Sequence, residues 1–178
     1  MFEERGFEAT TMRELARASG VAVGTVFVHF SDKGALLSAT LHDQVERALV
    51  RAAQTLPPRG AREQVLHLLG ALFKSYAKRP VLSRVLVKEL LFPTGAARAE
   101  ARDKVSDFLA QLRALCSAPG ALAPRADPGA AAEAIFAAYL AALVDGLGRD
   151  RPRPAEQLAL VDRLIEPWFQ PRSRRRSS

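Results

Sequence analysis

Apolar residues recur at three- and four-residue spacing along most of the chain, and the alternation typical of strands is absent. Alanine and leucine dominate these stretches, which favours helix. The pattern predicts short helices beginning near Met12 and Ala22, and a long helix over residues 32–55. Further helices are expected from Val65 towards Pro80, over residues 81–92, 96–117 and 130–147, and from Pro154 to Phe169. Residues 118–129 are rich in turn formers and predict a loop. The fold class is therefore expected to be all-α.

Composition places the chain among ordinary globular proteins. Hydrophobic residues make up 48% of its 178 residues and charged residues 25%. The longest apolar stretches are interrupted by charge or glycine, so we expect no membrane span. Glu3 and Glu4 stand where a signal peptide needs a basic start. The single cysteine, Cys116, has no partner for a disulfide or a metal site. Together these features predict a cytoplasmic protein.

Net charge alone does not locate a nucleic-acid site. The chain carries a formal charge of +7, but residues 1–55 hold six basic and seven acidic residues and so sum to 6 − 7 = −1. Much of the excess lies near the end, in residues 149–153 and 172–176. Residues 171–178 are expected to form a disordered basic tail, which either attracts DNA phosphates nonspecifically or keeps the protein soluble. A local motif must identify any DNA-reading element.

Residues 10–33 contain such a motif. Thr11 and Glu14 fit a capping box at the start of a helix. Ala16 is small where two helices approach closely, and Gly20 suits the left-handed turn that ends the first of them. Val26 returns an apolar side chain to the shared core. This spacing is what a helix-turn-helix requires, with its second helix projecting into the DNA major groove.

The string from Gly20 to Lys33, GVAVGTVFVHFSDK, resembles the TetR/AcrR family of regulators. Over residues 2–41 many positions fall in register with that family: Phe2, Gly6, Thr11, Ala16, Gly20, Val21, Gly24, Thr25, His29, Phe30, Lys33, Leu36 and Leu37. The resemblance implies a DNA-binding domain over residues 1–40 and a helical-bundle effector-binding and dimerisation domain over residues 41–170. Beyond residue 41 it is a resemblance of architecture only.

The family resemblance also implies which residues contact DNA: Arg13, Val23, Gly24, Thr25, Phe27, His29 and Lys33. Residues 23–25 would open the recognition helix and read base edges, while His29 and Lys33 would hold phosphates. Phe27 departs from the tyrosine usual in the family, so a phosphate-contacting hydroxyl is lost and the ring is kept. Ala22 often appears as serine in relatives, so a helix cap is also missing.

The beginning of the chain departs further from the family. Met1 and Phe2 align with the end of the family's first helix, so most of that helix is expected to be missing. Two interpretations remain open: a mis-set or truncated start, and a short regulator with impaired DNA binding. The missing segment usually brings basic residues, which would explain the charge of the N-terminal quarter.

The C-terminal domain offers candidates for a ligand cavity and a dimer interface. Eight mainly aromatic or bulky residues either line a cavity or form ordinary core: Phe73, Tyr76, Leu86, Phe92, Phe108, Phe136, Tyr139 and Leu143. The last two helices have broad apolar faces, which fits a homodimer formed by pairing them. Burial of one of them within the monomer is the alternative.

Catalytic and metal chemistry have little support in the sequence. His42 and Glu46 are four residues apart, a possible metal spacing, but no third ligand lies nearby and an ion pair or solvated face is favoured. We find no nucleophile paired with a base, no phosphate-binding glycine loop and no metal-ligand cluster, so neither an enzyme nor a cofactor is expected.

Two functions follow from these features. The first is a ligand-responsive transcriptional regulator, a repressor that a small apolar or amphipathic molecule releases from a palindromic double-stranded DNA operator, as the family resemblance implies. The alternative is an N-terminally truncated helical dimerisation protein without DNA binding of its own.

Overall fold

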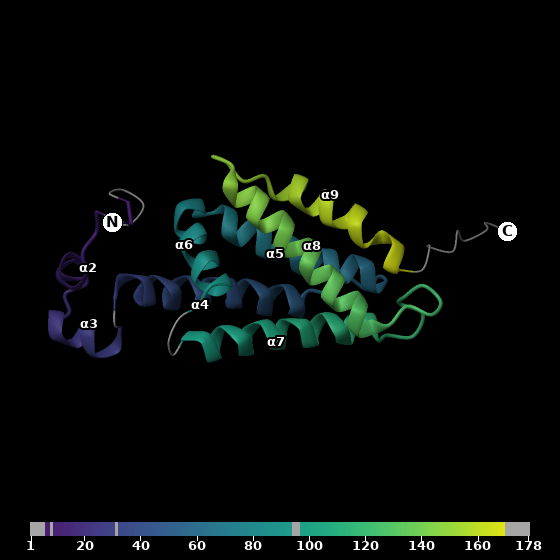
Figure 1. Cartoon of the computed structure of the whole chain (residues 1–178), viewed down its shortest axis with the longest axis horizontal. Helices are drawn as coiled ribbons and strands as arrows, with labels where there is room; N and C mark the ends of the chain where they lie inside the picture. Colours follow the sequence, from purple (N-terminus) through teal and green to yellow (C-terminus); the bar gives the residue numbers. More distant parts are fainter. Residues whose placement is uncertain (1–5, 8, 31, 94–96, 170–178) are drawn as a thin grey trace.

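The computed structural model describes residues 6–169 except residues 8, 31 and 94–96 (Figure 1). Its elements are α2 (Met12–Ala18), α3 (Val23–His29), α4 (Lys33–Gln54), α5 (Ala61–Ala77), α6 (Pro80–Leu91), α7 (Ala97–Cys116), α8 (Pro128–Gly148), α9 (Pro154–Ile165) and a short 3₁₀ turn (Glu166–Trp168). Within these residues the only β-type pairing is an isolated bridge between Leu122 and Phe169, and the all-α prediction is confirmed. Phe2 and the basic tail, 171–178, lie outside the described residues.

Side chains at the helix starts explain where several helices begin. Thr11 and Glu14 form the expected capping box of α2, in which the Glu14 carboxylate accepts from the Thr11 backbone N–H at 2.8 Å. The Asp32 side chain accepts from the backbone N–H of Ala35 at the start of α4. Asp127 does the same for α8. Each cap satisfies a backbone donor that has no partner within the helix, so these boundaries are set locally.

The helices form a small head and a larger body. Figure 1 shows α2 and α3 at one end of the long axis, with α4 leading from them into the body of α5–α9. Helix α5 lies at the centre of the body, where it contacts α4, α6, α7, α8 and α9. Its Val65, Leu69 and Phe73 side chains are fully buried. Helix α4 runs through the boundary predicted at residue 40, so head and body share one continuous helix.

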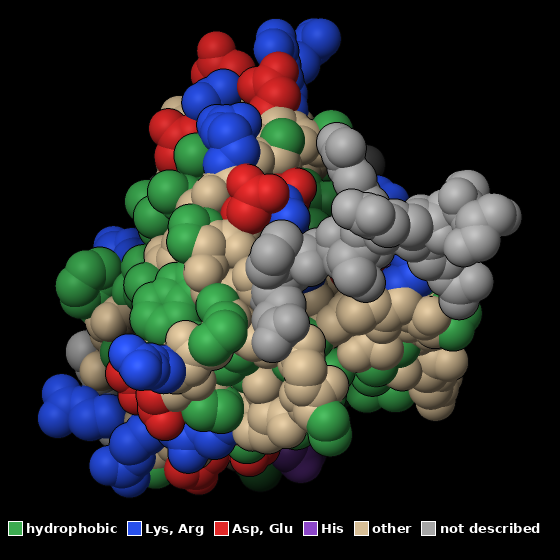
Figure 2. Space-filling view, turned by 90° about the vertical axis from the view of Figure 1, so that its right-hand side faces the viewer, with side chains coloured by type: hydrophobic (Ala, Val, Ile, Leu, Met, Phe, Trp, Pro, Cys, Tyr) green, Lys and Arg blue, Asp and Glu red, His purple; other side chains and the backbone are tan. Residues whose placement is uncertain are grey.

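The end of the body opposite the head has a mixed surface. Figure 2 looks onto this end and shows acidic and basic side chains close together at its margins, with hydrophobic side chains between them. A protein surface that binds the phosphates of DNA carries mainly positively charged side chains. In the described part of this face, opposite charges are intermixed instead.

Helix α8 is apolar on nearly all sides. Ile135, Tyr139 and Leu143 are buried in the core, whereas Ala141 and Val144 are exposed. By length and composition α8 is apolar enough to cross a membrane, so the expectation that no segment meets this requirement is wrong. Core helices of soluble proteins pass the same test, and 44% of the apolar window is buried inside the molecule. This property of α8 is therefore weak evidence for a membrane span.

Helices α8 and α9 interlock at a glycine. The buried Gln157 side chain donates from Nε2 to the carbonyl oxygen of Ala142 at 2.9 Å. A Cβ atom on Gly146 would overlap the same Nε2. Glycine at position 146 therefore leaves the space that the Gln157 side chain occupies.

Replacing Gly146 with alanine is expected to destabilise the fold. The added methyl group must displace a buried side chain and its hydrogen bond, and overpacking of this kind costs about 1–3 kcal/mol. Urea unfolding followed by circular dichroism measures the change. Gly148→Ala is the matched control, because a Cβ there meets nothing within 4 Å. Equal stability of the two variants would contradict the assigned contact.

Candidate nucleic-acid interface and ligand cavity

The turn between α2 and α3 has the geometry that its sequence predicts. Gly20 has φ +68°, the left-handed conformation in which a side chain is strained. The N–H of Val21 donates to the carbonyl of Ala16 at 3.0 Å and closes the turn. The Ala16 side chain is fully buried, so the small residue does stand where the chain packs closely. These residues fix the relative orientation of the two helices.

Helix α3 presents its side chains to solvent, and none of its seven residues is buried. Val23, Thr25, Phe27 and His29 are exposed, and Val28 is 81% exposed. Exposed apolar side chains gathered on one short helix are typical of a contact surface. Gly24 is also open, because a Cβ there would meet nothing within 4 Å. The glycine is thus not required by internal packing, and it leaves room for an approaching molecule.

The basic residues predicted to hold DNA differ in their surroundings. Arg13 is exposed on α2, and His29 is exposed in the last turn of α3. Lys33 is half-buried: its Nζ donates to the carbonyl oxygen of Phe7 at 2.8 Å and lies 4.6 Å from the Phe7 ring centroid. Lys33 therefore ties the first turn of α4 to the segment before α2. Sequence reasoning missed this internal role, because Phe7 is 26 positions away.

A second buried contact supports the same segment. Thr10 is 1% exposed, and its hydroxyl donates to the carbonyl of Gly6 at 2.8 Å. Gly6 has φ +84°, so the backbone turns there in the left-handed region. The turn at Gly6 and the bond from Thr10 thus fix the backbone just ahead of α2.

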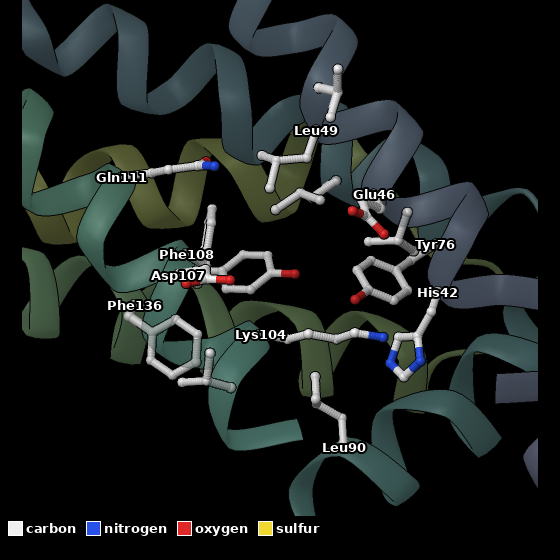
Figure 3. Close-up of a pocket in the computed structure, with 15 residues that line it drawn as sticks. His42, Glu46, Leu49, Tyr76, Leu90, Lys104, Asp107, Phe108, Gln111 and Phe136 are labelled. Atoms are coloured by element: carbon white, nitrogen blue, oxygen red, sulfur yellow. The ribbon is translucent and has the colours of Figure 1, made fainter. Parts of the chain in front are cut away.

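The body contains a cavity of about 360 Å³ between α4, α5, α7 and α8 (Figure 3). This volume lies at the lower end of the range for small-molecule pockets. The lining is mostly apolar or aromatic and comes from all four helices and the end of α6: His42, Val45, Glu46, Leu49, Val50, Leu72, Tyr76, Leu90, Lys104, Val105, Asp107, Phe108, Gln111, Phe136 and Tyr139. Glu46, Asp107 and Gln111 are exposed and form the mouth, whereas Leu72, Tyr76, Phe108 and Tyr139 are buried.

An aromatic cluster forms the inner wall. The Phe108 ring centroid lies 5.8 Å from that of Tyr139 and 6.2 Å from that of Phe136, both in edge-to-face arrangement. Tyr76 and Tyr139 are both buried against this cavity, and each influences the pKa of the other. Burial raises the pKa of both tyrosines, so both stay neutral at physiological pH.

A histidine and a lysine lie at one side of the cavity. Figure 3 shows the Lys104 side chain reaching towards His42, and the Lys104 ammonium is paired with the Glu100 carboxylate at 2.7 Å. Burial, and then the Lys104 charge, lower the pKa of His42, while Glu100 and Glu46 act in the opposite direction. His42 Nε2 is buried and has no hydrogen-bond partner among the described residues. The imidazole is thus neutral and offers an unused polar atom.

The structure brings together four of the eight predicted ligand residues: Tyr76, Phe108, Phe136 and Tyr139. Phe73, Leu86 and Leu143 are fully buried core residues that do not line the cavity, since their side chains point into the packing between helices. Phe92 follows the last turn of α6 and is 73% exposed. For these four residues the structure corrects the prediction of a cavity position.

Sequence reasoning missed the α4 side of the cavity. His42, Val45, Glu46 and Leu49 recur at the spacing of one helix face, and this is the signal that could have identified them. The sequence predicts an ion pair or a solvated face for His42 and Glu46 in preference to a metal site, whereas both residues line the cavity.

The head, the continuous helix α4 and the cavity together define a helix-turn-helix protein with a ligand-sized pocket in an attached helical body.

Comparison with known proteins agrees with this description. Residues 1–40 match the family described as bacterial regulatory proteins, tetR family. The chain is 31% identical over 146 residues to the HTH-type transcriptional repressor KstR of Rhodococcus jostii, covering 81% of this chain and 66% of that protein. It is 22% identical over 126 residues to the HTH-type transcriptional regulator UidR of Escherichia coli, covering 70% and 64% respectively.

The overall fold is shared with solved regulators. FadR of Bacillus subtilis, solved in complex with stearoyl-CoA, superimposes with a TM-score of 0.74 at 17% identity, covering 93% of this chain and 92% of that one. The chain belongs to the TetR family of bacterial regulatory proteins. It spans just under two thirds of the length of KstR and UidR.

Proposed function

We propose that this chain is a cytoplasmic, ligand-responsive transcriptional repressor that binds a palindromic DNA operator as a homodimer. The family supports DNA binding and regulation, since the matched relatives are a repressor and a regulator of transcription. An apolar or amphipathic effector is supported by the cavity lining and by the stearoyl-CoA bound to the structurally similar FadR.

Helix α4 carries this proposal. Its first turn is bound to the segment before the head through Lys33 and Phe7. Two turns further on, His42, Val45 and Leu49 on the same helix line the cavity. A ligand that prefers one position of α4 would therefore also bias the position of the head. It acts only through its difference in affinity for the two arrangements.

The exposed surface of the head supports the role of α3 as recognition helix. Val23, Gly24 and Thr25 lie in its first turn, where a helix entering the major groove meets base edges. Phe27 supplies an exposed ring beside them, while His29 and Arg13 are free of the body to reach phosphates. We propose that Lys33, in the first turn of α4, also approaches a phosphate.

The outer face of α8 and α9 supports a homodimer. Val144 on α8 and Leu164 on α9 are about half exposed, and the exposed Ala137 and Ala141 lie on the same side of α8 as Val144. Small residues in such a stripe allow the helices of two copies to approach closely. Pairing α8 and α9 with the same helices of a second copy would give a two-fold dimer, which matches the symmetry of a palindromic operator.

DNA binding is tested by fluorescence anisotropy with duplex DNA from upstream of the chain's own gene and a scrambled duplex of the same composition. Both titrations are made at one near-physiological salt concentration, because phosphate contacts are salt-dependent. We expect about 1,000-fold preference or more for the native duplex, because specific binding usually exceeds nonspecific binding by about 10³- to 10⁷-fold. Equal, weak binding of both would favour a dimerisation protein without DNA binding of its own.

A further inference from the structure

The buried polar atoms that line the cavity are uncharged, whereas the charged lining side chains, Glu46, Lys104 and Asp107, are exposed or half-buried. The uncharged atoms belong to Tyr76 on α5, Tyr139 on α8 and His42 on α4. Burial holds both tyrosines in the protonated form and His42 in the neutral form. A ligand that enters therefore meets hydrogen-bonding groups without meeting a buried counter-charge.

These neutral groups retain unused hydrogen-bonding capacity. Each tyrosine hydroxyl carries one hydrogen that it can donate and lone pairs that can accept, so the two together can bind an oxygen of the ligand. His42 Nε2 is buried without a partner among the described residues. This nitrogen donates or accepts according to the tautomer, and a hydroxyl group can partner either form. An unpaired buried polar atom is costly, so a ligand that satisfies it gains affinity.

The charged residues that line the cavity disfavour the entry of a negatively charged ligand. Lys104 is the one lysine or arginine among the described lining residues, and its ammonium is already paired with Glu100 at 2.7 Å. Glu46 and Asp107 also line the cavity and are exposed. With His42 neutral, the lining residues sum to +1 − 2 = −1. An anionic ligand would thus pass two carboxylates to reach a cation that is already neutralised.

We propose that the cavity selects an uncharged, mainly apolar molecule that carries hydroxyl or carbonyl oxygens, in preference to a carboxylate of the same size. The apolar part lies against Leu49, Leu72 and Phe108, and the oxygens meet the tyrosine pair and His42. The proposal rests on the proposed function, since it names the class of effector that the repressor would sense.

The experiment compares 1-decanol with decanoate, which share a ten-carbon chain and differ in the charge of the head group. Isothermal titration calorimetry of each into the DNA-free protein at pH 7.5 gives the two dissociation constants. We expect decanol to bind at least about tenfold more tightly, because the carboxylate loses hydration without gaining a free cation. Decanoate binding as tightly as decanol, or failure of decanol to bind, would overturn the proposal.

Two double variants identify the groups responsible. The double variant Glu46→Gln, Asp107→Asn removes both negative charges at the mouth, and both positions are exposed. It is expected to raise the affinity for decanoate and so to reduce the difference between the dissociation constants of decanoate and decanol. Tyr76→Phe with Tyr139→Phe removes the hydroxyl pair and is expected to weaken decanol binding about three- to tenfold, the usual effect of one neutral hydrogen bond. A ratio that neither double variant changes would contradict the assignment of selectivity to these groups.

DNA release is measured separately, by adding decanol to the protein bound to its native duplex. Tight decanol binding with unchanged DNA affinity would leave the ligand assignment standing and count against the proposed ligand-responsive function. If decanoate bound more tightly than decanol and released the DNA, the ligand assignment would be wrong and the proposed ligand-responsive function would stand. The two readouts therefore separate failure of the inference from failure of the function.

Discussion

Replacing Thr25 with glutamate is expected to reduce affinity for the native operator by roughly 100-fold or more, while leaving the fold intact. Thr25 is exposed at the third position of α3, where the proposed recognition helix meets the DNA. A carboxylate there removes the contacts of the original side chain and adds repulsion from nearby phosphates. An acidic residue in the first turn of a helix is favourable, so thermal stability should not fall.

Ala53→Glu provides the matched control for this variant. Ala53 is exposed near the other end of α4, far from the head, and the change in net charge is the same. Anisotropy with native and scrambled duplexes should show operator affinity near that of the unmodified protein for Ala53→Glu. Equal losses for the two variants would show that overall charge, and not the position of α3, determines binding.

The second large effect is expected at the proposed dimer interface. Val144→Asp places a short carboxylate on the exposed face of α8, near the C-terminal end of the helix, where two copies would bury it without a partner. An uncompensated buried charge costs about 3–5 kcal/mol, and two-fold symmetry introduces the change twice. The variant should therefore be monomeric at micromolar concentration, as measured by light scattering after size-exclusion chromatography. Operator affinity should fall with it.

Val81→Asp tests whether this effect is specific to the interface. Val81 on α6 is 50% exposed and Val144 is 47% exposed, so the same substitution disturbs each isolated copy to a similar extent. Val81→Asp should remain dimeric. A dimeric Val144→Asp protein would exclude the outer face of α8 as the interface.

Helix positions could be predicted from the sequence because their determinants are local. Thr11, Asp32 and Asp127 cap helices within three residues of their own positions. Gly20 alone determines the left-handed turn of the head. Features of this kind need no knowledge of the rest of the chain, and the expected helix boundaries agree with the structure to within a few residues.

The cavity was harder to predict because it depends on which helices face one another. Phe73 and Tyr76 are close in sequence on α5, yet only Tyr76 lines the cavity. Helix α8 is apolar on nearly all sides, so its sequence does not show which face is turned to the core and which is exposed. The contact between Gly146 and Gln157 likewise depends on the approach of two helices.

In the proposed function, occupancy of the cavity and binding of DNA are coupled through α4. Reciprocal titration tests it most directly: DNA affinity is measured with and without saturating decanol, and decanol affinity is measured for free and DNA-bound protein. Coupling requires both affinities to change by the same factor, and we expect roughly 5- to 150-fold weakening in each direction. Decanol binding that is equally tight with and without DNA, and leaves DNA affinity unchanged, would contradict the claim.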